Sequence, residues 1–204
     1  MEMKQSLAYH IFFPKLEIIK FFFFDNKQSL STLYEMFLNI NKLVEISFTK
    51  NFNTQNATSM YSMFSRCESL VSVDLSNFNT EKVENMGCMF ENCKSMKYVN
   101  LLSFNTEKVT TMHFMFKFCS SLESLNLSTF NTTNVNSMTE MFSECYSLKS
   151  ITQNFDGNKV KDISKMFYRC YSLTSLDFKN FNAEKIEYMD ATFCDCYSLT
   201  SIDL

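Results

Sequence analysis

Six of the eight cysteines occupy one repeating position, and thiols in register are the first candidates for chemistry. Each lies three residues after a phenylalanine; they are Cys67, Cys93, Cys119, Cys145, Cys170 and Cys196. Thiols stacked in neighbouring coils would lie near disulfide range, and disulfides are therefore one interpretation. A free cysteine also behaves as a small buried hydrophobic residue. We favour the second interpretation, a ladder of structural side chains.

Other residues suited to metal or acid–base chemistry are isolated. Cys88 and Cys194 fall outside the repeating position, and the segment Cys194-Asp195-Cys196 lacks the further ligands that a zinc site needs. Only two histidines occur, His10 and His113, and neither has an identified partner. The repeat position of His113 accepts Tyr, Gly, Thr, Ser or Asp elsewhere, which predicts a solvent-facing side chain. We expect no catalytic residue, no metal site and no cofactor, and hence no enzyme.

A regular repeat must position all these residues. Met-Phe pairs end at Phe37, Phe64, Phe90, Phe116, Phe142 and Phe167, and Thr192-Phe193 continues the series. The spacings are 27, 26, 26, 26, 25 and 26 residues. A period this steady is typical of a solenoid, here of about seven coils of 25–27 residues, in which each coil buries the apolar faces of its neighbours.

Each repeat has two halves with different periods. The first opens with a Leu-x-x-Val-x-Leu pattern, as at Leu70, and alternation at its end predicts a strand. In the second half, apolar residues recur at steps of three and four: Val83, Met86, Met89, Phe90 and Cys93. This spacing predicts one face of a short helix, with N-caps at Asn85, Thr111, Ser137 and Asp162. The predicted fold is α/β, with a parallel sheet on one face and short helices on the other.

Composition sets limits on domains and partners. A 204-residue chain with a formal net charge of -3 predicts one domain without the basic surface that nucleic acid requires. No apolar run is long enough to cross a membrane, and no secretory signal is recognised. We predict an N-terminal cap over residues 1–15 and a repeat solenoid over 16–204. The solenoid ends in an uncapped strand at 199–204, an edge that invites pairing with another chain.

The corner between the two halves is rich in asparagine, and the chain has only two glycines. Asn53, Asn79, Asn105, Asn131 and Asn182 each follow a phenylalanine. Asn can turn the chain by bonding its own backbone. We predict a buried ladder of amides that also satisfies backbone groups of the next coil.

Two exposed stripes are candidate partner-binding surfaces. Alternation places Asp74, Tyr98, Asn100, Asn126, Asp177 and Asp203 on the outer face of the sheet, which repeat proteins commonly use for recognition; a merely solvated face is the alternative. The second stripe is Tyr146, Tyr171 and Tyr197, each directly after a ladder cysteine. Tyrosine is enriched at interfaces, and a self-stacked aromatic ladder is the alternative.

The strings SLVSVDLSNFNTEKVENMGCMFENC and SLESLNLSTFNTTNVNSMTEMFSEC resemble the repeat of the BspA-like leucine-rich-repeat surface proteins. The resemblance covers about residues 16 to 204. It implies a leucine-rich-repeat-like solenoid that binds other proteins, as a cell-surface or secreted adhesin or host-protein binder. Because neither an export signal nor an anchor is seen, the alternative is a structural subunit of a larger intracellular assembly.

Overall fold

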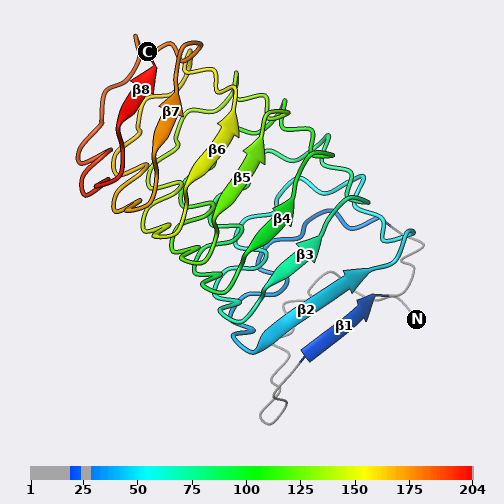
Figure 1. Cartoon of the computed structure of the whole chain (residues 1–204). Helices are drawn as coiled ribbons and strands as arrows, with labels where there is room; N and C mark the ends of the chain where they lie inside the picture. The colour runs from blue at the N-terminus through cyan, green and yellow to red at the C-terminus, as the bar shows by residue number, and fades with distance from the viewer. Residues whose placement is uncertain (1–18, 24–28, 204) are drawn as a thin grey trace.

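A computed structural model describes residues 19–23 and 29–203 and shows a parallel β-solenoid of about six turns. The strands are β1 (Ile19–Phe23), β2 (Leu43–Phe48), β3 (Ser72–Asp74), β4 (Tyr98–Asn100), β5 (Ser124–Leu127), β6 (Ser150–Gln153), β7 (Ser175–Asp177) and β8 (Ser201–Asp203). They follow one another along one face of the molecule (Figure 1). The predicted cap over residues 1–15 lies outside the described residues, and the number of turns is lower than the seven predicted.

The strands form where the leucine-rich pattern predicts them. Strands β1 to β4 make one parallel sheet, β5 pairs with β6, and β7 pairs with β8. Equivalent residues of successive repeats face each other; for example, Val73 pairs with Val99 and Leu176 with Ile202. The repeat period therefore sets the register directly, and each residue type is stacked on its counterpart in the next coil.

The predicted short helices are wrong: no described residue is helical. We call the run around each Met-Phe pair, such as residues 60–67, a Met-Phe segment. Two positions in each of these segments have a left-handed backbone, such as Ser62 (φ 53°) and Arg66 (φ 61°). A right-handed helix cannot pass through such residues. The segment instead folds into consecutive turns, in which the N–H of Met63 bonds to the carbonyl of Met60 and that of Cys67 to Phe64.

Hydrogen bonds between coils explain why this conformation forms in place of a helix. In each Met-Phe segment, alternate N–H groups donate to carbonyls of the following coil, as Phe64 does to Met89 (2.9 Å) and Phe90 to Met115 (2.9 Å). All these bonds in the Met-Phe segments point from one coil to the next in the C-terminal direction. In a helix, the same N–H groups would bond to carbonyls within their own coil. The hydrogen bonds between neighbouring coils would then be lost.

The core lies between the sheet and the Met-Phe segments. Rings of the repeating phenylalanines, from Phe37 to Phe193, stack with successive centroids 5.3–5.8 Å apart. The predicted inward-facing residues, Val83, Met86, Met89, Phe90 and Cys93, are all fully buried. The inward orientation deduced from the spacing is confirmed although the helix is not, because turns of three to four residues return the chain to the same side.

The asparagine corner works differently from the prediction. Asn79 and Asn105 are exposed, and each amide oxygen accepts the N–H two residues later (3.0 Å). The buried residue is the threonine that follows each asparagine: Thr54, Thr80, Thr106 and Thr132. Its hydroxyl donates to a carbonyl of the next coil and accepts an N–H from the same residue. Asparagine thus turns the chain, and threonine joins the coils.

The residues predicted as helix N-caps begin the turn segments instead. Asn85, Thr111, Ser137 and Asp162 form a second ladder of isolated parallel bridges, which Ser59 and Tyr188 extend at its two ends. The side chain of Asn85 still accepts an N–H two residues later, that of Gly87 (2.9 Å). A short polar side chain caps a turn by the same bond that it would use to cap a helix.

The described part of the chain holds no apolar helix of membrane-spanning length.

Candidate partner-binding surfaces

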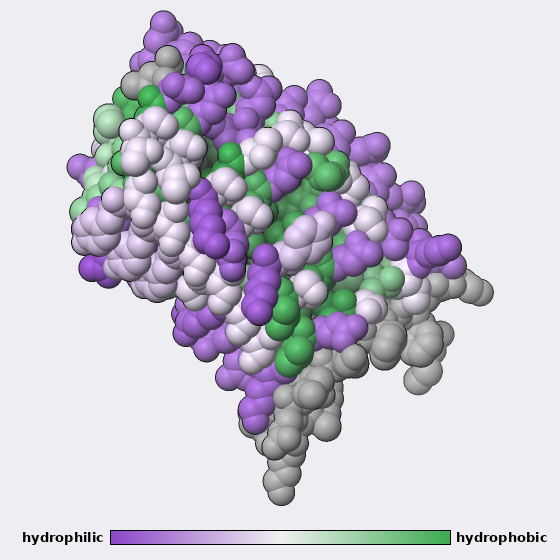
Figure 2. Space-filling view, viewed as in Figure 1, coloured by the Kyte–Doolittle hydropathy of each residue, from purple (hydrophilic) through white to green (hydrophobic). Residues whose placement is uncertain are grey.

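The sheet-face stripe lies on the outer surface, as alternation predicts. Asp74, Tyr98, Asn126, Asp177 and Asp203 are exposed, and Asn100 is half-buried. Several of these side chains also stabilise turns, since the Asp74 carboxylate accepts the N–H of Ser76 (2.9 Å), and Asp177 that of Lys179 (3.0 Å). Figure 2 shows polar and apolar side chains mixed on this face. Its acidic and amide groups therefore cap turns while facing solvent.

The tyrosine stripe is a continuous stack. The rings of Tyr146 and Tyr171 are 5.1 Å apart and nearly parallel (9°), and those of Tyr171 and Tyr197 are 5.5 Å apart (9°). Exposure rises along the stack, to 36% for Tyr171 and 78% for Tyr197. The stacked arrangement given as the alternative is present.

Carboxylates two residues before the tyrosines hold two of the phenol groups. Tyr146 donates to Glu144 (2.5 Å), which raises the pKa of Tyr146 to about 12, with burial and the Glu144 charge adding to the effect. Tyr197 donates to Asp195 (3.0 Å), and this bond likewise raises its pKa. These bonds fix the rings in place, and rigid aromatic rings lose little entropy when a partner binds.

A second aromatic group, which the sequence pattern did not predict, lies on the Met-Phe side. The rings of Tyr34 and Tyr61 stack at 5.3 Å, and Tyr61 lies 5.9 Å from His113. Tyr61 and His113 belong to coils separated by one other coil, and Gly87 fills the position between them. A Cβ added to Gly87 would lie 2.5 Å from the His113 ring. The sequence held a signal for this group: one repeat position carries Tyr61, Gly87 and His113 in three successive coils.

The prediction that His113 faces solvent is wrong, because its imidazole fills the space above Gly87. The ring is half-buried, and its Nδ1 lies 2.7 Å from the hydroxyl of Thr111. Burial lowers the pKa of His113, so the neutral form is favoured near pH 7. Its contacts are those of a packed side chain, and we assign it no chemical role.

The cysteine ladder is buried as predicted at five of its six positions, whereas Cys196 is half-buried. Cys67, Cys93, Cys119, Cys145 and Cys170 are fully buried free thiols. Each thiol donates to the carbonyl of the repeating phenylalanine in the preceding coil, at 3.0–3.2 Å. Burial raises the pKa of Cys67 to about 12 and that of the other four well above the ordinary value. Such thiols are poor nucleophiles, whereas Cys194 is exposed.

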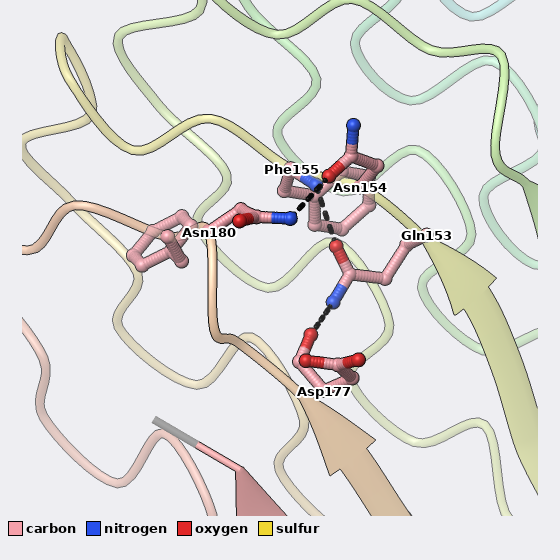
Figure 3. Close-up of a pocket in the computed structure, with 6 residues that line it drawn as sticks. Gln153, Asn154, Phe155, Asp177 and Asn180 are labelled. Atoms are coloured by element: carbon pink, nitrogen blue, oxygen red, sulfur yellow. Dashed lines mark hydrogen bonds between the residues drawn. The ribbon is translucent and has the colours of Figure 1, made fainter.

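Where the repeat is one residue shorter, a small polar hollow opens between the ends of β6 and β7 (Figure 3). Gln153, Asn154, Phe155, Asp177, Asn180 and Phe181 line it, and its volume is about 20 Å³. The Gln153 amide donates to the carbonyl of Asp177, and Asn180 donates to Asn154 (3.0 Å). The hollow has room for about one water molecule, and its amides largely satisfy one another.

Within the described residues, no three His, Cys, Asp or Glu side chains cluster as metal ligands would.

Comparison with known proteins places the chain in a family. Residues 23–100 and 92–202 match the family model described as "Mycoplasma protein of unknown function, DUF285". No curated protein matches the chain. Among solved structures, it is similar to a leucine-rich repeat protein from Bacteroides ovatus, with 18% identity, a TM-score of 0.40, and 72% of this chain and 41% of that chain covered.

A leucine-rich cell surface protein from Faecalibacterium prausnitzii is also similar, with 14% identity, a TM-score of 0.31, and 83% of this chain and 68% of that chain covered. The present chain thus spans about two fifths of the length of the Bacteroides protein. The family match is broader, since its two segments together extend over most of the solenoid. The chain belongs to the family described as Mycoplasma protein of unknown function, DUF285.

Proposed function

We propose that this solenoid is a non-enzymatic protein-binding module that uses the tyrosine stripe and the adjoining end of the sheet face. The observation that carries the proposal is the rigid stack of Tyr146, Tyr171 and Tyr197, which ends in a ring that is 78% exposed. Tyrosines supply large contact area with a polar tip, and pre-ordered rings reduce the entropic cost of binding. By resemblance to the BspA-like proteins, the partner belongs to a host or another cell surface.

The test replaces all three tyrosines by serine. The immobilised 204-residue chain is exposed to surface-protein extracts, and retained proteins are identified by mass spectrometry. The triple variant is expected to lose a partner that the unmodified chain retains. Tyr34→Ser is the matched control, because Tyr34 is 53% exposed but lies outside both stripes. Retention of the same partner by the triple variant, with an unchanged circular dichroism spectrum, would contradict the proposal.

The second candidate is a structural subunit of a larger assembly, and the hydrogen bonds between coils are the observation that bears on it. In the preceding coils the Met-Phe N–H groups donate forward, as Phe167 does to Thr192 and Arg169 to Cys194. The corresponding groups of Met189, Ala191, Phe193 and Asp195 have no acceptor among the described residues. An array of donors at hydrogen-bonding spacing pairs with a further coil or with another polypeptide.

Location separates the two candidates. Protease treatment of intact cells that make the protein is expected to digest an exposed binding module and to leave an internal subunit whole. Detection uses an antibody against the solenoid, and a cytoplasmic protein followed in the same sample reports cell integrity. Complete protection of the solenoid in intact cells, with digestion after lysis, would favour the structural subunit.

A further inference from the structure

Two phenol rings of the tyrosine stripe, those of Tyr146 and Tyr171, lie face to face in neighbouring coils. Their centroids are 5.1 Å apart, and the ring planes differ by only 9°. Parallel rings at this separation bring the ortho carbons of the two phenols close to each other. Tyr171 is 36% exposed and Tyr146 is half-buried, so an oxidant in solvent reaches the pair.

One-electron oxidation joins phenols that are held in this way. A phenol that loses an electron also loses its proton, and two adjacent phenoxyl radicals combine through a carbon–carbon bond between their ortho positions. The hydrogen on each coupled carbon then leaves as a proton, each phenol oxygen regains a proton, and the product is dityrosine. Two rings fixed beside each other have a high effective concentration, which favours coupling within one chain over coupling between chains.

Glu144 supplies the proton acceptor that oxidation of Tyr146 needs. Its carboxylate accepts the phenol hydrogen bond at 2.5 Å, and it can take the proton in the same step in which the ring loses its electron. Arg169 holds the equivalent place two residues before Tyr171, and a guanidinium cannot accept a proton. The first radical therefore forms on Tyr146, and Tyr171 supplies the second.

From this arrangement we propose that Tyr146 and Tyr171 are a site of oxidative modification, at which a haem peroxidase and hydrogen peroxide join the two side chains as dityrosine. The two phenols each give up one electron and one proton, and one hydrogen peroxide is reduced to two water molecules. The covalent loop from residue 146 to residue 171 restricts the unfolded chain and so stabilises the solenoid, as a disulfide would. This modification goes beyond the proposed function, because it needs no bound partner.

The test treats the chain with a haem peroxidase and hydrogen peroxide. All proteins carry Cys194→Ser and Tyr197→Phe, because the exposed Cys194 thiol competes for the oxidant and the Tyr197 ring also stacks on Tyr171. Dityrosine is measured by its fluorescence, and tandem mass spectrometry of tryptic peptides locates the linked residues. A Tyr146–Tyr171 link in the monomeric fraction, lighter by two hydrogen atoms, is expected. Its yield is expected to stay constant when the protein is diluted.

Three further variants in this background separate the proposed site from random coupling. Tyr171→Phe keeps the stacked ring but removes the phenol, and it is expected to lose the link. Glu144→Gln keeps a hydrogen-bond acceptor for Tyr146 but removes the base, and it is expected to slow formation of the link about tenfold. Tyr98→Phe is the control, since Tyr98 is 59% exposed but lies in strand β4; it is expected to leave the yield unchanged.

Dityrosine that forms only between chains, with a yield that falls on dilution, would overturn the proposal. Equal dityrosine fluorescence in Tyr171→Phe and in the background protein would do the same. An unchanged rate in Glu144→Gln would contradict the role of Glu144 as the proton acceptor. The linked chain is also expected to unfold at a higher temperature than the untreated chain, whereas peroxidase treatment of Tyr171→Phe is expected to produce no such rise. Circular dichroism before treatment confirms that each variant is folded.

Discussion

Thr106 and Asn131, in neighbouring coils, are joined by two hydrogen bonds through a single hydroxyl. The Thr106 Oγ1 donates to the Asn131 carbonyl (2.9 Å) and accepts the Asn131 N–H (2.8 Å). Thr106 is almost completely buried. One side chain therefore satisfies both backbone groups of a residue in the next coil, at a corner where no strand supplies such bonds.

Replacing Thr106 by valine is expected to destabilise the solenoid by about 2–4 kcal/mol, because an isosteric methyl leaves a buried donor and acceptor without partners. Urea unfolding followed by circular dichroism measures the change. Thr133→Val is the control; Thr133 is exposed, and its hydroxyl makes only a 3.5 Å contact with Asp156. Equal stability of the two variants would contradict the structural role of the hydroxyl ladder.

Gly87 and His113 form a second coupled pair, since the imidazole occupies the place of a side chain at position 87. Gly87→Ala is expected to displace the ring, separate it from Tyr61 and lower stability by about 1–2 kcal/mol, a cost typical of overpacking. In a His113→Ala background the same change is expected to cost little. A double-mutant cycle from urea unfolding measures the coupling, and purely additive effects would contradict the arrangement.

The buried thiols predict loss of stability at alkaline pH. The folded pKa of Cys67 is about 12 against 9.0 for an ordinary thiol. Because the folded value is raised, the contribution of the neutral thiol is complete below pH 9.0. It is lost as pH rises toward 12, where only the unfolded chain releases the proton. Each such thiol is expected to lower the unfolding free energy by about 1.4 kcal/mol per pH unit in this window.

The test compares the free energy of unfolding of the unmodified chain with that of Cys67→Ala as a function of pH. The slope of the variant is expected to be shallower by the contribution of one thiol. Other groups that titrate in the same range contribute equally to both proteins and cancel in the comparison. Thiol labelling at pH 8 gives a second readout, since exposed Cys194 is expected to react well before the ladder cysteines. Parallel stability curves together with rapid labelling of every thiol would contradict the assignment.

The candidate surfaces were partly predictable from sequence. Strict alternation in a strand fixes which residues face outward, so the exposed positions of Asp74, Asp177 and Asp203 followed from the leucine pattern. The spacing of tyrosine after cysteine predicted a stripe, but a one-dimensional pattern could not decide between separate and stacked rings. The Tyr61, Gly87 and His113 group was missed because its contact spans two coil boundaries.

The amino-acid sequence by itself determined the repeat, its period, the strands and the residues that point inward, because these depend on local spacing and hydrophobicity. Only the tertiary structure decided how the Met-Phe half folds, which corner residue joins the coils and where the aromatic rings meet. The spacing of three and four residues is compatible both with a helix and with consecutive turns. Hydrogen bonds to the next coil select the turns, and those bonds exist only once the neighbouring coil is in place.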